Sequence, residues 1–282
     1  MGDLQPARRL DLLPLYPVER AELLDLLTGL EPAEWAAPTE CPARSVKGIA
    51  LHLLADDLSL LSRQRDEEPP GVAIEPGSSF DELFVALDRF NERWVEAASF
   101  FSTPLLVELL GLSGEWTERF YGSADPDRPA EVVAWIGPDP APYWLVTARE
   151  YFERWIHQLQ IRRAVGRPGL HDARFVLPAV AVAVRGFPQG LAALPAADAT
   201  TVTISIAEHD AAWTVRSDGQ RWALFDGGPD EPTVTLPLDL DSAALLFSRA
   251  LTSAELGERV QPKGDSDLGA LIVAGLAAFF GR

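Results

Sequence analysis

Two residues in the segment EYFERWIHQL have the types and the spacing of metal ligands. Glu153 and His157 are four positions apart, and His157 is one of only 4 histidines among 282 residues. In a helix each residue advances by about 100°, so the two side chains would project within about 40° of each other. They could bind one divalent cation together. They could also lie on an ordinary solvated face, because the apolar stripe of this segment runs along the opposite side.

The residues around this pair weaken the solvated interpretation. Tyr151 and Trp155 belong to an apolar stripe that we expect to face the core of a helical bundle, yet Val146 and Ile161 lie near the polar side of the same helix. A helix that is apolar on two sides usually packs between two layers. A buried carboxylate beside a buried imidazole would then need a compensating partner, and a divalent cation would be one.

A second segment, ALHLLADD, supplies one more candidate ligand. His52 lies at the edge of an aliphatic stripe, where a lone histidine is more often a hydrogen-bonded core residue than a ligand. Together with Glu153 and His157 it completes a His-Glu-His set, which is common in catalytic zinc sites and leaves a fourth position open. The same donors also suit nickel, iron or manganese. We therefore predict these three residues as ligands of a divalent metal, with zinc as the first choice and nickel as the second.

The other polar residues near these segments have several interpretations. Asp56 follows His52 by one helical turn and could be an acceptor behind the ligand, an alternative ligand or an exposed helix charge. Glu150 is a weaker alternative to Glu153. Three further residues of reactive type are expected to have a structural role or to lie in loops: Cys41, His171 and His209.

The composition limits the classes of function. Apolar residues make up 47% and charged residues 23% of the chain, as in soluble globular proteins. The formal net charge of −18 argues against nucleic acid or an anionic membrane as a partner, because both require a basic surface. A single cysteine excludes an internal disulfide and a cysteine-based metal site. We expect a cytoplasmic protein, since no signal peptide and no apolar run of membrane-spanning length is recognisable.

Familiar catalytic motifs of other enzyme classes are missing from the sequence. No G-x-S-x-G, P-loop or G-x-G-x-x-G stands between a strand pattern and a helix pattern. Serine-hydrolase chemistry and nucleotide-dependent chemistry therefore have no support.

The first part of the chain has the periodicity of long amphipathic helices. Four segments carry it, and they predict a four-helix bundle: 17–30, 45–68, 78–101 and 140–169. We interpret the segment 103–139 as a long crossover connection, because its helical patches lead into a stretch rich in proline and glycine.

The periodicity changes after residue 170. Four short runs alternate with period two, and two helical runs follow: 200–206, 211–217, 221–227, 233–240, 241–251 and 267–280. These patterns predict an antiparallel sheet covered by helices. The expected fold is therefore α+β, with a helical bundle in residues 1–170 and a sheet domain in residues 171–282.

Two segments resemble a known family. TECPARSVKGIALHLLADDLSLL (39–61) resembles the second-helix segment of mycothiol-dependent maleylpyruvate isomerases and of the wider DinB-like bundles. In that family a Thr-x-Cys-Pro stretch precedes the helix that carries the first metal histidine, which corresponds here to His52. TAREYFERWIHQLQIRRAVGRPG (147–169) is similar to the family's later metal-binding helix. Its glutamate and its histidine four residues on correspond to Glu153 and His157.

The resemblance extends into the second part of the chain. VTLPLDLDSAALLFSRAL and VQPKGDSDLGAL are similar to the sterol-carrier-like domain that follows the bundle in this family. There a helix that ends in Gly-Arg precedes a short strand and a Gly-Asp turn. The corresponding pairs are Ser248-Arg249 and Gly264-Asp265. The resemblance implies a catalytic arginine in this domain, and Arg249 is the position that matches it, although serine replaces the preceding glycine.

The resemblance also implies an activity. It predicts a metal-dependent enzyme that uses a low-molecular-weight thiol, mycothiol, to isomerise or S-conjugate a small electrophile that bears a carboxylate. The alternative is a protein without catalytic activity that binds a small molecule or lipid and has a structural metal site.

Overall fold

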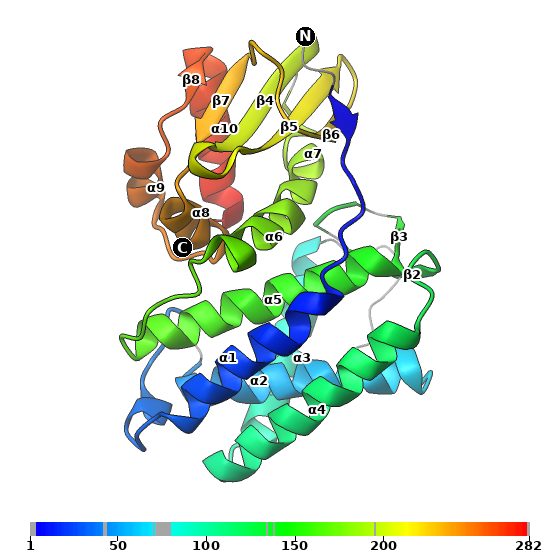
Figure 1. Cartoon of the computed structure of the whole chain (residues 1–282), viewed down its shortest axis with the longest axis vertical. Coiled ribbons are helices and arrows are strands. Elements are labelled where there is room, and N and C mark those ends of the chain that lie inside the picture. Colours follow the sequence, from blue (N-terminus) through cyan, green and yellow to red (C-terminus); the bar gives the residue numbers. More distant parts are fainter. Residues whose placement is uncertain are drawn as a thin grey trace. The chain divides into compact units, whose positions relative to one another are not determined.

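The computed structural model describes residues 4–41, 44–69, 71, 80–133, 135–137, 139–194 and 196–280. Pro42 of the Thr-x-Cys-Pro stretch lies outside them. The chain forms two compact units, which we name the helical unit and the sheet unit (Figure 1). The helical unit contains Leu13–Asp125 and His157–Gly169, and the sheet unit contains Met1–Leu12, Pro126–Ile156 and Leu170–Arg282. The domain boundary at residue 170 stays a prediction.

The helical unit is built from α1 (Tyr16–Thr28), α2 (Val46–Leu60), α3 (Phe80–Ala97), α4 (Thr103–Ser123) and the last turns of α5 (Tyr143–Ala164). Helix α2 begins after Ser45, whose side chain accepts a hydrogen bond from the backbone N–H of Gly48, and it continues into a π-helical segment, Leu61–Arg65. Aliphatic side chains from several of these helices form one core, including Leu27, Ile49, Leu54, Leu110 and Ile161.

Helix α4 differs from the expectation, because the segment 103–139 was predicted as a crossover connection and its first part is a helix of 21 residues. The buried face of this helix includes Ser113, Gly114 and Thr117, which interrupt the apolar stripe that would have revealed it. A Cβ atom on Gly114 would lie 3.0 Å from Nε of Arg20, so the glycine makes room for this arginine.

A buried ion pair fixes helix α2 against its neighbours. Nη2 of Arg20 on α1 donates to Oδ2 of Asp57 on α2 at 2.8 Å, and Oγ of Ser113 on α4 donates to the same oxygen at 2.6 Å. Nη1 of Arg20 donates to the backbone oxygen of Leu110 at 3.0 Å. Because Asp57 is completely buried, these bonds compensate its charge and hold the helix that carries His52.

The sheet unit contains a six-stranded sheet with the strand order β1-β6-β5-β4-β7-β8. Its strands are β1 (Gln5–Pro6), β4 (Asp198–Ile206), β5 (Ala211–Asp218), β6 (Trp222–Asp226), β7 (Val234–Pro237) and β8 (Lys263–Gly264). Strands β4, β5 and β6 form the predicted antiparallel meander. Strand β7 pairs with β4 in parallel, so the sheet is mixed. After β6 the chain crosses to the edge of β4 that is not paired with β5, and there β7 runs in the same direction as β4.

Helices accompany this sheet, as the α+β prediction required. They are α6 (Ala173–Ala183), α7 (Phe187–Gly190), α8 (Leu240–Phe247), α9 (Ser253–Arg259) and α10 (Ser266–Phe280). Helix α7 contacts β6, α10 contacts β7, and α6 packs on α8 (Figure 1). A separate two-stranded hairpin, β2 (Pro129–Val132) and β3 (Pro140–Pro142), precedes α5.

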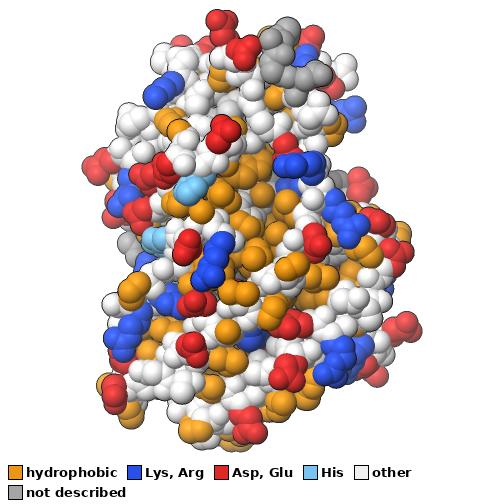
Figure 2. Space-filling view, viewed as in Figure 1, with side chains coloured by type: hydrophobic (Ala, Val, Ile, Leu, Met, Phe, Trp, Pro, Cys, Tyr) orange, Lys and Arg blue, Asp and Glu red, His pale blue; other side chains and the backbone are white. Residues whose placement is uncertain are grey.

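The surface carries charged side chains of both signs. On the face shown in Figure 2, acidic and basic side chains are interspersed with apolar ones. None of the helices in the described part of the chain is long and apolar enough to cross a membrane.

Candidate metal centre

Helices α2 and α5 bring His52 and His157 together inside the helical unit. The centroids of the two imidazole rings are 4.8 Å apart and the ring planes are perpendicular, with an angle of 90°. His52 is 6% and His157 is 8% exposed. The interpretation of His157 as part of a solvated helix face is therefore wrong.

Burial keeps both imidazoles neutral near neutral pH. It lowers the pKa of His157 to about 4 and the pKa of His52 well below its ordinary value. The positive charge of Arg44 lowers the pKa of both rings further, and His157 has the same effect on His52. Neutral imidazole is the form that binds a metal ion, so the environment prepares both side chains for this role.

The hydrogen bonds of the two rings differ. Nδ1 of His157 lies 2.8 Å from Oε1 of Gln160, and because an amide oxygen only accepts, Nδ1 carries the proton and Nε2 keeps its lone pair. Nε2 of His52 lies 3.3 Å from Oδ2 of Asp56. Nδ1 of His52 is buried and has no hydrogen-bond partner in the described part of the chain. A buried ring nitrogen without a partner is a group that a metal or a ligand could satisfy.

Glu153 lies one turn before His157 on α5 and is half-buried. Burial raises the pKa of its carboxyl, and the charges of Arg149 and Arg249 oppose this shift. Among the described residues, no three side chains of His, Cys, Asp or Glu are grouped closely enough to hold a metal ion. The structure thus brings His52 and His157 together as a pair, and Glu153 as a third ligand stays a prediction.

Glu150 is already compensated by neighbouring arginines. Its carboxylate forms an ion pair with Arg154 at 3.1 Å, one turn later on α5, and a second one with Arg149. Both Glu150 and Arg154 are buried. These contacts make Glu150 a weaker candidate for a metal ligand than Glu153, because a metal would have to displace them.

The aromatic stripe of α5, which we expected to face the core of the helical bundle, forms its hydrogen bonds within the sheet unit. The hydroxyl of Tyr151 donates to the backbone oxygen of Phe175 at 3.4 Å, and Nε1 of Trp155 donates to the backbone oxygen of Leu170 at 3.3 Å. All four residues belong to the sheet unit. Buried hydroxyl and indole groups need acceptors, and the backbone carbonyl groups of Leu170 and Phe175 provide them.

Arg249 has an unusual backbone conformation at the end of α8. The N–H of Ala250 donates to the carbonyl of Leu245, and the N–H of Arg249 donates to the carbonyl of Leu246. This is the Schellman pattern, and Arg249 occupies its left-handed position with φ 58°. Glycine is usual there, so this backbone conformation is strained for an arginine. Its charge reaches Glu153 in the same unit.

The remaining candidates lie where the sequence placed them. His171 is in the loop before α6, and its Nδ1 lies 2.9 Å from Oδ1 of Asp241. His209 is exposed in the turn between β4 and β5, and Cys41 is half-buried before α2.

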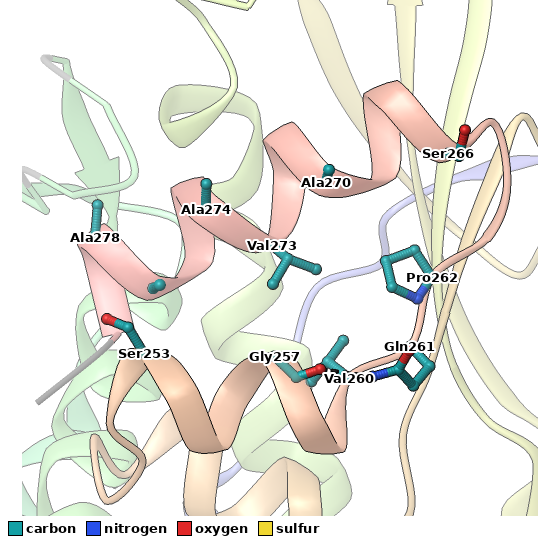
Figure 3. A pocket seen from close by; sticks show the side chains of 11 residues that line it. Ser253, Gly257, Val260, Gln261, Pro262, Ser266, Ala270, Val273, Ala274 and Ala278 are labelled. Atoms are coloured by element: carbon teal, nitrogen blue, oxygen red, sulfur yellow. Dashed lines mark hydrogen bonds between the residues drawn. The ribbon is translucent and has the colours of Figure 1, made fainter.

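A groove of about 710 Å³ lies between α9 and α10 of the sheet unit. Figure 3 shows small and apolar side chains on its walls, such as Ala270, Val273 and Ala274 on α10 and Val260 after α9. None of the predicted site residues lines it.

Two residues near the histidine pair were not singled out from the sequence. Gln160 could have been found, because its position three residues after His157 places it beside that histidine on a helix. Arg44 directly precedes the N-cap of α2, and no spacing rule connects it with His157.

Comparison with known proteins supports the resemblance. Residues 16–162, just over half of the chain, match the family model described as the mycothiol maleylpyruvate isomerase N-terminal domain. Two similar solved structures are a mycothiol-dependent maleylpyruvate isomerase and a histidine-to-alanine mutant of such an enzyme. Each is 12% identical, covers 90% of this chain and 93% of its own, and has a TM-score of 0.55. No curated protein sequence matches the chain.

The lowered pKa of His157 predicts how stability depends on pH. Between about pH 4 and 6.5 the unfolded chain binds a proton at this residue and the folded chain does not, so stability should rise with pH there. The contribution is on the order of 3 kcal/mol and is complete above pH 6.5. Denaturant unfolding at a series of pH values should give a shallower dependence for His157→Phe than for the wild type.

The exposed histidine provides the control for this measurement. His209→Phe makes the same substitution at an exposed loop position and is the matched control variant. An unchanged slope in His157→Phe would contradict the burial of a neutral imidazole.

Proposed function

The chain belongs to the mycothiol maleylpyruvate isomerase family, and on this basis we propose that it is a metal-dependent, mycothiol-using enzyme. Its substrate would be a small electrophile that bears a carboxylate, which it would isomerise or conjugate to sulfur. The observation that carries the proposal is the pair of buried, neutral histidines, His52 and His157, in the segments that resemble the family's metal-binding helices. The expected cytoplasmic location belongs to the same proposal.

The donor types of the three predicted ligands would suit a divalent metal. His52, with a buried ring nitrogen that has no partner in the described chain, and His157 would supply two imidazoles. Glu153, one turn before His157, would supply the carboxylate, and this set suits zinc first and nickel second. When bound, the metal would lower the pKa of a coordinated thiol, so that a thiolate exists near neutral pH.

Residues around the pair would hold the ligands in place. Gln160 accepts the Nδ1–H of His157 and leaves Nε2 as the coordinating nitrogen. Asp56 lies beside Nε2 of His52 and would favour the tautomer that leaves Nδ1 unprotonated. The ion pair of Arg20 with Asp57 holds α2, so that His52 keeps its place opposite His157.

The reaction would proceed by addition of the thiolate to the electrophile. A new C–S bond forms, and the electron pair of the attacked double bond moves into the conjugated carbonyl group. After rotation about the resulting single bond, the reverse step expels the thiolate and completes an isomerisation. If the adduct is protonated instead, the thiol stays attached and the outcome is S-conjugation.

Arg249 is the proposed catalytic residue of the sheet unit. A guanidinium group can bind a substrate carboxylate with two parallel hydrogen bonds and can stabilise negative charge that develops on the adjoining carbonyl. Its left-handed conformation at the end of α8 supports this proposal, because the fold accepts strain to keep an arginine there.

A second candidate function rests on the groove between α9 and α10. Its volume of about 710 Å³ and its apolar walls would suit a small apolar ligand. In that case the protein would bind a small molecule or lipid without turnover, and the metal would be structural. An assay of the metal-loaded protein with mycothiol and an electrophile separates the two functions. Turnover supports the enzyme, and no turnover supports the binding protein.

Metal content provides the first test of the proposed function. The purified protein should bind close to one zinc or nickel ion per chain, and His52→Ala and His157→Ala should lose most of it because each removes an imidazole ligand. The loop variant His209→Ala should retain the metal. Elemental analysis after dialysis measures this, and full metal content in both ligand variants would refute the assigned site.

Arg249→Gly separates the strain at α8 from catalysis. Glycine relieves the left-handed conformation, so the free energy of unfolding should rise by about 1 kcal/mol. Loss of a charge-assisted hydrogen bond should lower kcat/KM for maleylpyruvate with mycothiol by about 10- to 100-fold. Arg249→Lys, which keeps the charge, should lose less. Unchanged kcat/KM in Arg249→Gly would remove Arg249 from the reaction.

A further inference from the structure

We propose that Arg44 is a second anion-binding residue, which holds a carboxylate group of the small molecule that occupies the site at His52 and His157. The inference rests on the proposed function, in that it assigns a ligand class to the same site. It is carried by the backbone of Arg44, the place of its first side-chain carbons beside α2, and the absence of an acidic partner among the residues that the structure describes.

The backbone at Arg44 is held by a tight turn. Its N–H donates to the carbonyl of Cys41 at 2.9 Å, and its own carbonyl accepts from Oγ1 of Thr39 at 2.7 Å. The N–H of Cys41 donates to Oγ1 of Thr39 at 3.2 Å, and Pro38 pairs with Ser45 across the turn. The threonine and cysteine of the Thr-x-Cys-Pro stretch therefore fix the residue that directly precedes the N-cap of α2.

The first side-chain carbons of Arg44 lie beside Gly48 on α2. A Cβ atom on Gly48 would lie 3.5 Å from Cβ and 3.8 Å from Cγ of Arg44, so the aliphatic stem lies beside this glycine. Gly48 precedes His52 by one turn on the same face of the helix. The charge of Arg44 also reaches the rings of both His52 and His157.

Arg44 differs in its charge environment from the ion-paired arginines of the helical unit. Five arginines of this unit form ion pairs with acidic residues: Arg20 with Asp57, Arg65 with Asp66, Arg162 with Glu22, Arg163 with Glu40 and Arg167 with Glu34. Within the described ranges Arg44 forms no such pair. In a chain of net charge −18, an arginine that has no carboxylate partner in the described ranges and whose charge acts on two neutral imidazoles leaves a positive site for an incoming anion.

The geometry of the guanidinium group selects the kind of anion. Its planar arrangement of N–H donors matches a carboxylate bidentately, whereas a thiolate offers a single acceptor atom. The thiolate would occupy the metal, and Arg44 would bind a carboxylate of the same or the second small molecule. Metal binding would add positive charge and strengthen the attraction for such an anion.

The test measures anion binding in the metal-free protein. With 4 histidines in the chain, histidine-selective ¹⁵N NMR gives a resolved probe at His52 and His157, while His171 and His209 report non-specific effects. Propionate is titrated at constant ionic strength, with the isosteric neutral amide propionamide as the comparison. Propionate should shift the ring signals of His52 and His157 in a saturable manner, and propionamide should not.

Substitutions then assign the binding to Arg44. Arg44→Met keeps the stem beside Gly48 and should weaken propionate binding about 10-fold or more, because it removes charge-assisted hydrogen bonds. Arg44→Lys should weaken it less. Arg167→Met removes an arginine that is paired with Glu34 in the same unit and should bind as the wild type does.

Several results would overturn the proposal. They are no saturable shift in the wild type, equal shifts with propionamide, and wild-type affinity in Arg44→Met. Because the titration contains no metal, it is independent of metal content. A protein that binds propionate through Arg44 but no metal would refute the proposed function and leave the role of Arg44 intact.

Discussion

Helix α5 must bury polar and charged side chains on most of its surface, and the site depends on how that burial is compensated. Glu150 and Arg154 neutralise each other, and Nε2 of Gln158 donates to Oε1 of Glu19 at 2.8 Å. Burial lowers the pKa of His157 and keeps its imidazole neutral. A buried neutral imidazole with a fixed Nδ1–H is a prepared metal ligand, so the same constraint that stabilises the helix also creates the candidate site.

The second histidine is positioned by independent means. The hydrogen bonds of Asp57 with Arg20 and Ser113 connect α2 to α1 and α4. They fix the position of α2, and with it the position of His52 opposite His157. The turn before α2 adds Arg44 to the same face. Buried ion pairs contribute little net stability, but removal of one partner is costly, so they define where a helix must lie.

Much of this arrangement could be predicted from the sequence, because it depends on local spacing. Glu153 and His157 are i and i+4 on one helix, and the four period-two runs identified strands β4, β5, β6 and β7. Helix α4 was not predicted. Its apolar stripe is interrupted by Ser113 and Gly114, which accommodate the buried ion pair of Arg20 with Asp57. The contacts of Tyr151 and Trp155 with carbonyl groups from later in the chain, and the strained backbone of Arg249, depend on tertiary structure that no local pattern encodes.

X-ray absorption spectroscopy of the zinc-loaded protein, recorded with and without mycothiol, tests the central claim most directly. The account predicts zinc bound by two imidazoles and one carboxylate, with an oxygen ligand replaced on addition of mycothiol by one sulfur at about 2.3 Å. A spectrum without imidazole scattering, or one in which mycothiol introduces no sulfur, would contradict it.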